Sequence, residues 1–252
     1  METKLFDKSW IGKVVSFANS NTRWRLTAKL RDKNNQFTAG EMKDFPDAIS
    51  GAYGTFKCEN VDHPTKTAFM RIAMQVPYAG AKPDSLARQA SQKIPSYGQL
   101  MLDAYSTFRE RDVQSTARLL DMKSESQDHT GMLPGGSILY LVIEKAPGKQ
   151  LYSARFWSLE SQERDKIRYA FAAAWRECVA NGFRPFGDVS SLFWDSLSGT
   201  ITIYNLMTAY PTDPTDEWSN MQWIVWGLAK APDWYRWWAE TDRNPSMEGW
   251  LL

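Results

Sequence analysis

The segment GDVSSLFWDSLSGTITIYNLMTAY, from Gly187 to Tyr210, holds the residues whose types and spacing are best suited to chemistry. Asp188 and Asp195 are two acids on one short stretch, and Asn205 directly follows an alternating apolar and polar run. Two carboxylates can act as a general acid and a general base, and carboxylate and amide oxygens can bind a divalent cation. Asp also favours turns, and on so short a loop a pair of solvated turn residues is the stronger interpretation of the two acids.

Other common catalytic sets do not occur in the sequence. It has no GxSxG, HExxH or P-loop motif and no DDxxD or DxDD cluster. His63 lies in a predicted turn and His129 in a polar loop, so both are interpreted as surface residues. Cys58 and Cys178 are far apart in the chain and form no CxxC pair, which predicts two buried or idle thiols and neither a zinc site nor a disulfide framework. We therefore expect no cofactor and no metal.

The elements that position the segment follow from periodicity and turn residues. A helical stripe covers 97–108 behind Ser96, and the strongest helix covers 159–181, with Ser158 as the expected N-cap and Gly182 at its end. Polar, turn-rich connections are expected over 31–47 and 77–95. Strands are predicted at 13–17, 24–30, 51–58, 67–76 and 138–144. A strand pair is predicted from the apolar run after the Gly187-Asp188 turn and the alternating strand 200–204, around the turn Ser198-Gly199. This order predicts an α+β chain with a sheet-based lobe over 1–145 and a helical lobe with a Trp-rich tail over 146–252.

Four segments in this order resemble the kinase-like fold, in particular its aminoglycoside-phosphotransferase-like branch and a group of fungal kinase-like proteins. The resemblance implies a two-lobed α+β fold, with a small antiparallel-sheet N-lobe and a mainly helical C-lobe. The segments resemble the strand that carries the nucleotide-binding Lys, the hinge strand, the catalytic loop and the strand that ends in the Asp-Phe-Gly metal motif. They are AFMRIAMQVP (68–77), ILYLVIEKAPGKQL (138–151), GDVSSLFWD (187–195) and TIYNLMTAY (202–210).

The resemblance also implies a short set of charged groups, because phosphoryl transfer depends on positioning and charge neutralisation. Arg71 stands where the strand Lys is expected, and a guanidinium does not replace an ammonium point charge. Asp188 matches the catalytic base, but Phe193 lies near the position of the metal-binding Asn. Asn205 stands at the metal-binding Asp, followed by Leu206-Met207 in place of Phe-Gly.

Two further groups of the family have no clear counterpart. The helix Glu aligns with Tyr97-Gly98-Gln99, with Asp103 one turn later, and no GxGxxG motif precedes it. Conventional kinase activity is therefore not expected. Structural interpretations stay open for the residues that remain: a turn or helix-cap acid for Asp188, a salt-bridged or exposed strand residue for Arg71, and a turn residue for Asn205.

A kinase-like cleft without kinase chemistry predicts a small-molecule enzyme that shapes an apolar substrate for cyclisation or isomerisation, with pericyclic closure of the Diels-Alder type as the extreme case. Fungal specialised metabolism is the setting that the resemblance implies. The alternatives are a pseudokinase-type module that binds a protein or a nucleotide and, third, an atypical small-molecule phosphotransferase. The candidate catalytic residues are Arg71, Asp188 and Asn205, and the candidate substrate-binding residues are Tyr53, Met70, Phe193, Trp194, Tyr204 and Met207.

The composition of the chain excludes some classes of binding partner. Thirty basic and 29 acidic residues give a net charge of +1, and their interleaving predicts no nucleic-acid or anionic-membrane surface. No secretory leader or membrane span is expected, which favours a cytoplasmic protein. Seven of the 12 tryptophans fall between Trp218 and Trp250, so this tail is expected to form core, a pocket or an interface with a protein partner. The expected ligand is a small apolar organic molecule between the two lobes.

Overall fold

The computed structural model describes residues 5–213, 215–242 and 244–252, and the chain divides into two compact units. The first unit comprises the residues up to Leu102 together with Leu119–Lys145. The second comprises Asp103–Arg118 and Ala146–Leu252. Residues 103–118, which the sequence analysis placed in the N-terminal lobe, thus group with the second unit.

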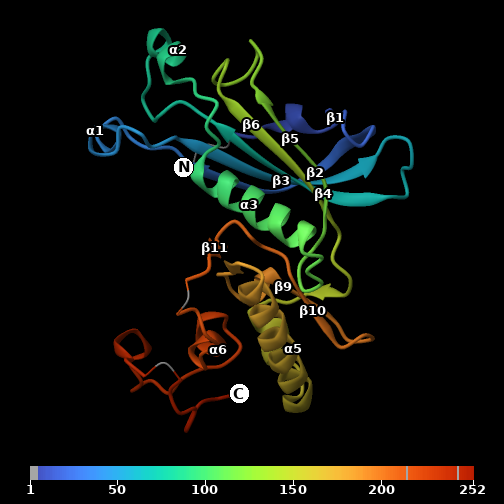
Figure 1. Cartoon of the computed structure of the whole chain (residues 1–252), viewed down its shortest axis with the longest axis vertical. Coiled ribbons are helices and arrows are strands. Elements are labelled where there is room, and N and C mark those ends of the chain that lie inside the picture. Colours follow the sequence, from blue (N-terminus) through green and yellow to red (C-terminus); the bar gives the residue numbers. More distant parts are fainter. Residues whose placement is uncertain (1–4, 214, 243) are drawn as a thin grey trace. The chain divides into compact units, whose positions relative to one another are not determined.

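A six-stranded antiparallel sheet forms the centre of the first unit (Figure 1). Its order is β1-β2-β3-β4-β6-β5, so three consecutive hairpins are followed by a crossover that places β6 beside β4. Periodicity predicted five of these strands, whereas β5 was missed and β2 is longer than expected. The strands are β1 (Val14–Phe17), β2 (Thr22–Asn35), β3 (Gly51–Asn60), β4 (Thr67–Gln75), β5 (Leu119–Ser126) and β6 (Ser137–Glu144).

The two faces of this sheet are covered by different parts of the chain. One face carries the hydrophobic core of the unit, which includes Phe6 and Phe17 from the N-terminal segment, Trp24 from β2, and Met70 and Ile72 from β4. On the other face lies the start of helix α3 (Ser96–Glu110), the helix predicted over 97–108. Its Gly98 approaches β4 so closely that an added Cβ would lie 2.7 Å from the Cβ of Ala73.

Short helices occupy the long connections of the first unit. They are η1 (Lys8–Trp10), α1 (Glu41–Asp44), η2 (Pro83–Ser85) and α2 (Leu86–Gln89). The connection between β2 and β3 contains α1, where a kinase-like sheet is expected to carry its glycine-rich loop. Its backbone is fixed by a side-chain pair: Glu41 accepts from the Thr38 N–H at 2.7 Å, and Thr38 Oγ1 accepts from the Glu41 N–H at 3.2 Å.

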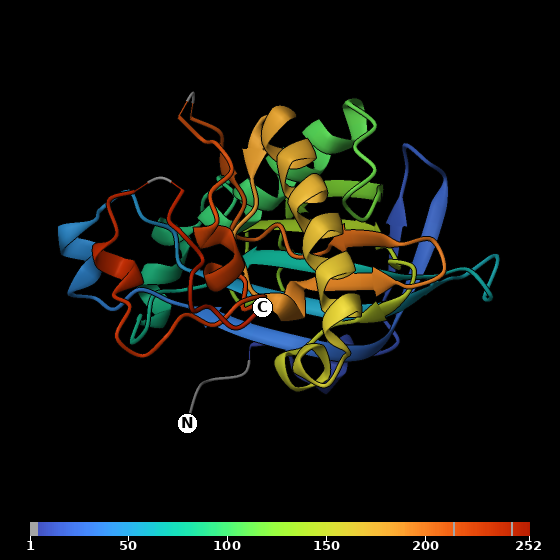
Figure 2. The ribbon, with the colours of Figure 1, turned by 90° about the horizontal axis from the view of Figure 1, so that it is seen from below.

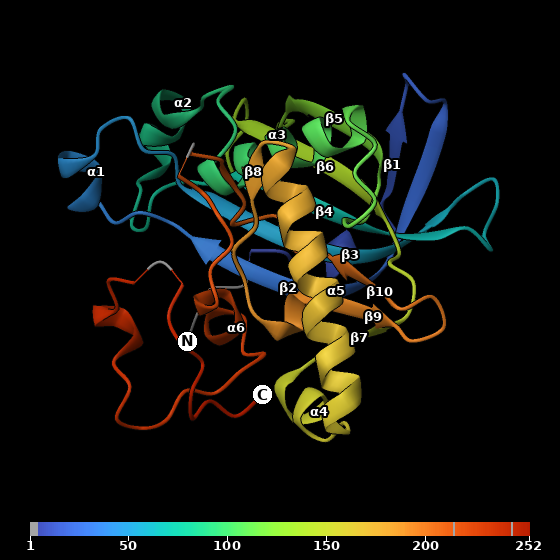
Figure 3. The ribbon, with the colours of Figure 1, turned by 60° about the horizontal axis from the view of Figure 1, so that its bottom comes forward.

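Helix α5 (Ser161–Ala180) is the long element of the second unit and lies between a strand pair and the C-terminal segment (Figure 3). The strand pair is β9 (Leu192–Asp195) with β10 (Thr200–Ile203), joined by the predicted turn, in which Gly199 has φ +69°. Figure 2 shows the C-terminal segment as loops interrupted by short helices. The remaining elements are β7 (Lys149–Gln150), α4 (Ser153–Trp157), β8 (Phe183–Arg184), η3 (Val189–Ser191), β11 (Tyr210–Pro211), α6 (Met221–Val225) and η4 (Trp237–Ala239).

The ends of α5 bear out one prediction and correct another. Gly182 has φ +98°, which suits the glycine that ends a helix. The expected N-cap Ser158 instead ends α4, where its hydroxyl donates to the Arg155 carbonyl at 2.8 Å, and Glu160 holds the N-cap position of α5 without a side-chain bond. Ser158 was a plausible cap by residue type, but α4 ends there first.

Tryptophans of the C-terminal segment build the core of the second unit against α5. The Trp226 ring centroid lies 4.8 Å from that of Phe171, and Trp218 lies 5.5 Å from Trp175 and 4.7 Å from Trp223. Trp175 and Trp226 are fully buried. Large rigid rings give this loop-rich segment the buried apolar area that its short helices cannot supply alone.

The predicted α+β, two-lobed kinase-like fold is present in the order of elements and in the antiparallel topology of the first sheet. In the described part of the chain, no helix has both the length and the apolar character needed to cross a membrane.

Candidate functional site

Arg71 and Tyr53 lie on the face of the first sheet that α3 begins to cover. Tyr53 is paired with Ala73 in the register of β3 and β4, and Arg71 is two residues before Ala73, so the side chains share a face. Arg71 is only 6% exposed and Tyr53 2%. Burial raises the pKa of Tyr53 to about 12, so its hydroxyl stays protonated near neutrality. The structure therefore brings a buried cation and a neutral hydroxyl to one face of the first unit.

Met70 is a core residue and does not belong with these two side chains. It directly precedes Arg71 on β4, and neighbouring residues of a strand point to opposite faces. Met70 is fully buried in the hydrophobic core beneath the N-terminal segment. Met70 thus lies on the opposite face of β4 from Arg71, within the core of the first unit.

Asp188 is exposed and lies at the start of η3, where its carboxylate serves the backbone. The carboxylate accepts the Ser190 N–H at 2.8 Å and the Ser190 hydroxyl as well. Asp195 bonds in the same local manner, accepting from the Leu197 N–H at 3.1 Å and the Ser198 hydroxyl at 2.7 Å, and these bonds lower its pKa. Each acid thus holds its own turn, which fits the structural interpretation.

Asn205 follows β10 and lies in the second unit, as Asp188 does. Its side-chain oxygen accepts the Met207 N–H at 3.4 Å, an Asx-type turn, and the side chain is half-buried. Leu206 is fully buried and Met207 is 9% exposed. Where a metal motif is expected, the segment presents one neutral amide and two apolar side chains.

Phe193 and Tyr204 form an aromatic pair across the second unit's strand pair. Their ring centroids lie 5.1 Å apart, Phe193 is half-buried and Tyr204 is 7% exposed. The Tyr204 backbone is fixed on both sides: its N–H donates to the Ser191 carbonyl at 2.8 Å, and its carbonyl accepts the Tyr105 hydroxyl at 2.6 Å. The structure therefore brings Phe193 into contact with Tyr204, which directly precedes Asn205 in the chain.

Trp194 points away from that stretch. Its indole N–H donates to Glu163 Oε1 on α5 at 2.8 Å, and this bond is the main reason why the pKa of Glu163 lies below its usual range. Because Phe193 and Trp194 are neighbours on β9, only one of them can face Tyr204. Trp194 therefore ties the strand pair to α5.

The groups at these positions differ from those that the kinase resemblance predicts for phosphoryl transfer. Among the described residues, no three His, Cys, Asp or Glu side chains gather as a metal site would require. The resemblance placed Phe193 and Asn205 near two Mg²⁺ ligands of the kinase mechanism, and neither side chain carries charge.

Sequence reasoning missed two cavities of the first unit. One, of about 270 Å³, lies around α1, α2 and the end of β4 and includes Asp47, Gln75, Arg88 and Lys93 in its walls. The second, of about 540 Å³, lies between the N-terminal segment and the loop that joins β5 to β6. No sequence signal could have found them, because their walls come from segments that are far apart in the chain.

The order of the elements, with an antiparallel sheet in the first unit and a long helix in the second, is similar to that of the kinase-like fold. No family model and no curated protein matches the sequence. Among solved structures, the chain is similar to the Cydia pomonella granulovirus kinase PK-1, with 11% identity and a TM-score of 0.45. The match covers 80% of this chain and 60% of the viral kinase, so the chain spans about three fifths of the length of that protein.

Proposed function

We propose that this chain is a non-phosphorylating small-molecule enzyme on a kinase-like scaffold, which shapes an apolar substrate for cyclisation or isomerisation. One observation carries the proposal: Asn205, at the expected metal ligand, is neutral, holds its own turn at 3.4 Å from the Met207 nitrogen, and is followed by two buried apolar residues. Mg²⁺ chemistry needs negative charge at this point. The setting that we propose is fungal specialised metabolism, as the sequence resemblance implies.

The proposed chemistry uses shape and an uncharged donor. The apolar contacts are assigned to Phe193, whose ring lies on that of Tyr204, and to Met207, two residues after the half-buried Asn205. The Asn205 side-chain NH₂ makes no hydrogen bond to any described residue, so it can donate to a substrate carbonyl on which charge develops during ring closure. Holding a flexible molecule in a reactive shape can lower an intramolecular barrier by up to about 7–11 kcal/mol.

Mass spectrometry tests the proposal across a whole class of substrates at once. The purified protein is incubated with a library of neutral polyenes and dienones, with and without ATP and Mg²⁺. Cyclisation and isomerisation conserve mass, so we expect a product of unchanged mass and altered retention time that forms without ATP. Asn205→Ala should slow product formation roughly 10²–10³-fold if the amide supplies the donor.

Asp62→Asn is the matched control, because Asp62 is an exposed partner of Arg23 in the first unit, at 2.6 Å, and should leave the rate unchanged. A product that gains a phosphoryl group in the presence of ATP would overturn the proposal. So would dose-dependent thermal stabilisation by ATP and Mg²⁺ that Asn205→Ala abolishes, since that would mark a working nucleotide site.

A second candidate is a binding module for a protein partner, and one observation favours it. Trp234 and Trp238 in the C-terminal segment are 71% and 67% exposed, unlike the tryptophans packed on α5. Large exposed aromatic side chains are typical of interaction surfaces. The double variant Trp234→Ala/Trp238→Ala should then lose capture of the protein partner and keep the small-molecule reaction. Unchanged capture with loss of the reaction would favour the enzyme proposal over the binding module.

A further inference from the structure

The larger cavity of the first unit has walls of two chemical kinds. Trp10 and Lys13 come from the segment around η1, Glu125 and Asp128 come from the end of β5 and the loop after it, and Tyr140 comes from β6. Apolar side chains from β4, the loop and β6 complete the walls: Met74, Met132 and Ile138. Its volume of about 540 Å³ is that of a small organic ligand and far exceeds that of a bare ion.

Negative charge predominates in this cavity. Among the described residues, its walls carry the three acids Asp7, Glu125 and Asp128 and one cation, Lys13. Hydrogen bonds from Ser9 lower the pKa of Asp7, and hydrogen bonds from Thr130 lower that of Asp128, so both carboxylates stay ionised well below neutral pH. Glu125 is bridged by Lys123 at 2.8 Å, which leaves the Asp7 and Asp128 charges to set the potential.

Two aromatic rings in this region already hold ammonium groups. Lys13 Nζ lies 4.3 Å from the centroid of the Trp10 ring, and Lys123 Nζ lies 5.0 Å from that of Tyr140. A cation is attracted to the face of an aromatic ring, most strongly to that of Trp. The cavity therefore has the combination that recognises organic cations, namely carboxylates beside aromatic faces.

Tyr140 provides an observation that is independent of the acids. Its side chain is only 9% exposed, it lines the cavity, and its hydroxyl makes no hydrogen bond to any described residue. Burial, together with Glu125 and Asp128, raises its pKa, so the hydroxyl is neutral and its oxygen can accept a bond. The hydroxyl oxygen is thus open to the cavity, where it can accept an N–H of a bound ammonium.

We propose that this cavity binds a small alkylammonium ion, whose charge lies near Trp10, Tyr140 and the carboxylates and whose alkyl chain packs on Met74, Met132 and Ile138. A metal ion does not suit the site, because no three metal-binding side chains gather in the described part of the chain. The inference goes beyond the proposed function and does not depend on it, since all of its residues lie in the first unit. Lys13 competes for the same ring, so its removal should expose the site further.

Nuclear magnetic resonance titration tests the proposal with three probes of one chain length: hexylammonium, 1-hexanol and hexanoate. The Trp10 indole N–H signal is assigned by its loss in Trp10→Phe and is followed in the full-length protein. We expect hexylammonium to shift it in a saturable way, at concentrations where hexanol and hexanoate do not. Equal shifts with hexanol would show an apolar cavity with no preference for a cation and would overturn the proposal.

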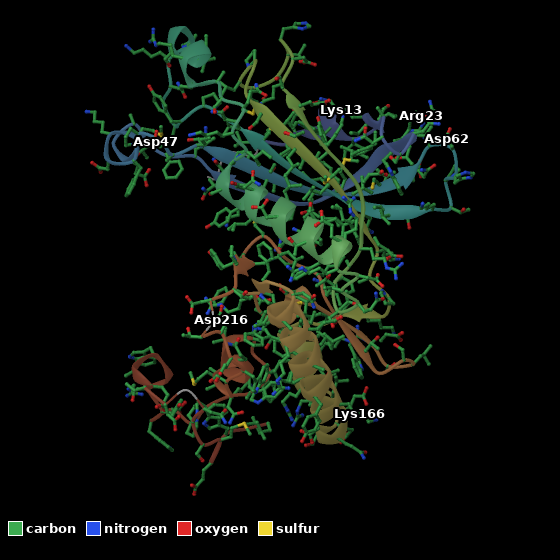
Figure 4. The ribbon with its side chains drawn as sticks, viewed as in Figure 1. Lys13, Arg23, Asp47, Asp62, Lys166 and Asp216 are labelled. Atoms are coloured by element: carbon green, nitrogen blue, oxygen red, sulfur yellow. The ribbon has the colours of Figure 1, made fainter. Side chains whose placement is uncertain are left out.

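Three substitutions sharpen the test. Lys13→Gln should tighten hexylammonium binding about three- to tenfold, because it removes the competing cation. Tyr140→Phe keeps the ring but loses the acceptor, and should weaken binding by about the same factor. The Asp62 carboxylate pairs with Arg23 at 2.6 Å (Figure 4). Asp62→Asn should leave binding unchanged. A gain of affinity in Lys13→Gln cannot arise from misfolding. If neither the wild type nor Lys13→Gln binds hexylammonium, the proposal is overturned.

Discussion

The hydrogen bond between Trp194 and Glu163 should make a contribution to the unfolding free energy that depends on pH. The indole N–H donates to the Glu163 carboxylate at 2.8 Å, and the Glu163 side chain is about one quarter exposed. Trp194→Phe keeps an aromatic ring and removes the donor, so we expect a loss of roughly 1–2 kcal/mol in unfolding free energy at neutral pH. Urea denaturation followed by circular dichroism measures this loss.

The pH dependence of that loss follows from the lowered pKa of Glu163. A carboxyl whose pKa is lower in the folded state contributes stability above its unfolded pKa, ordinarily about 4.3, and the contribution disappears as pH falls through the folded value. The deficit of Trp194→Phe should therefore shrink below about pH 4, leaving only the effect of the smaller ring. Lys166→Ala is the control and should cost under about 0.5 kcal/mol, because that lysine is 60% exposed. A deficit that grows on acidification would contradict the assignment.

Individual residues differ in how far the sequence could place them. The opposite orientation of Met70 and Arg71 was predictable, because a strand alternates its side chains, and the same rule separates Phe193 from Trp194. The local bonds of Asp188 are typical of its residue type before a Ser, and the open structural interpretation anticipated them. Tyr140 could not be recognised, because its surroundings come from segments more than 100 residues apart.

At the scale of elements, substitutions at two glycines distinguish the cost of backbone strain from the cost of a steric clash. Gly148 (φ +76°) and Gly199 (φ +69°) both have left-handed backbone, which costs a non-glycine residue roughly 1–2 kcal/mol. A Cβ on Gly199 would meet nothing within 4 Å, whereas a Cβ on Gly148 would lie 2.2 Å from the Trp194 carbonyl oxygen. Gly148→Ala must therefore displace β9 from β7, where Lys149 pairs with Trp194.

We expect Gly199→Ala to lower the unfolding free energy by roughly 1–2 kcal/mol and Gly148→Ala to lower it by at least about 3 kcal/mol. Urea denaturation of the two variants beside the wild type measures the difference, and soluble yield gives a second readout if Gly148→Ala fails to accumulate. Equal losses would show that the contact with the Trp194 carbonyl relaxes at no cost.

The elements that sequence patterns missed share a physical reason. β5 has the sequence LLDMKSES and lies at the edge of the sheet, where only Leu119 and Asp121 are buried, so its apolar alternation is too short to recognise. Its place is fixed by tertiary bonds instead: Asp121 accepts from the Trp24 indole at 2.8 Å and from the Thr22 hydroxyl at 2.7 Å. Helix α4 has only five residues, fewer than periodicity can detect.

For the molecule as a whole, α3 is an element that both units require. Its first part packs in the first unit, where Tyr97 lies 5.6 Å from Tyr53 between ring centroids. Its second part packs in the second unit, where Phe108 lies 6.0 Å from Phe183 and the Tyr105 hydroxyl donates to the Tyr204 carbonyl. Either part alone is too short to be a stable helix. Unfolding of one unit should therefore remove support from the other.

The two cysteines can measure this coupling, because each unit buries one of them. Cys58 in the first unit is 1% exposed and burial raises its pKa to about 12, while Cys178 in the second is fully buried and its pKa is raised as well. Neither thiol should react with a thiolate-specific reagent in the folded protein, and both should react on unfolding, when their pKa values return to about 8.5. Cys58→Ala and Cys178→Ala each leave a single reporter thiol. Circular dichroism measures how much each substitution changes the stability of the protein. After correction for that change, we expect pulsed labelling to give the same urea midpoint for both variants. If Cys178 became reactive at urea concentrations where Cys58 stays protected, the second unit would unfold without the first, and α3 would not couple them.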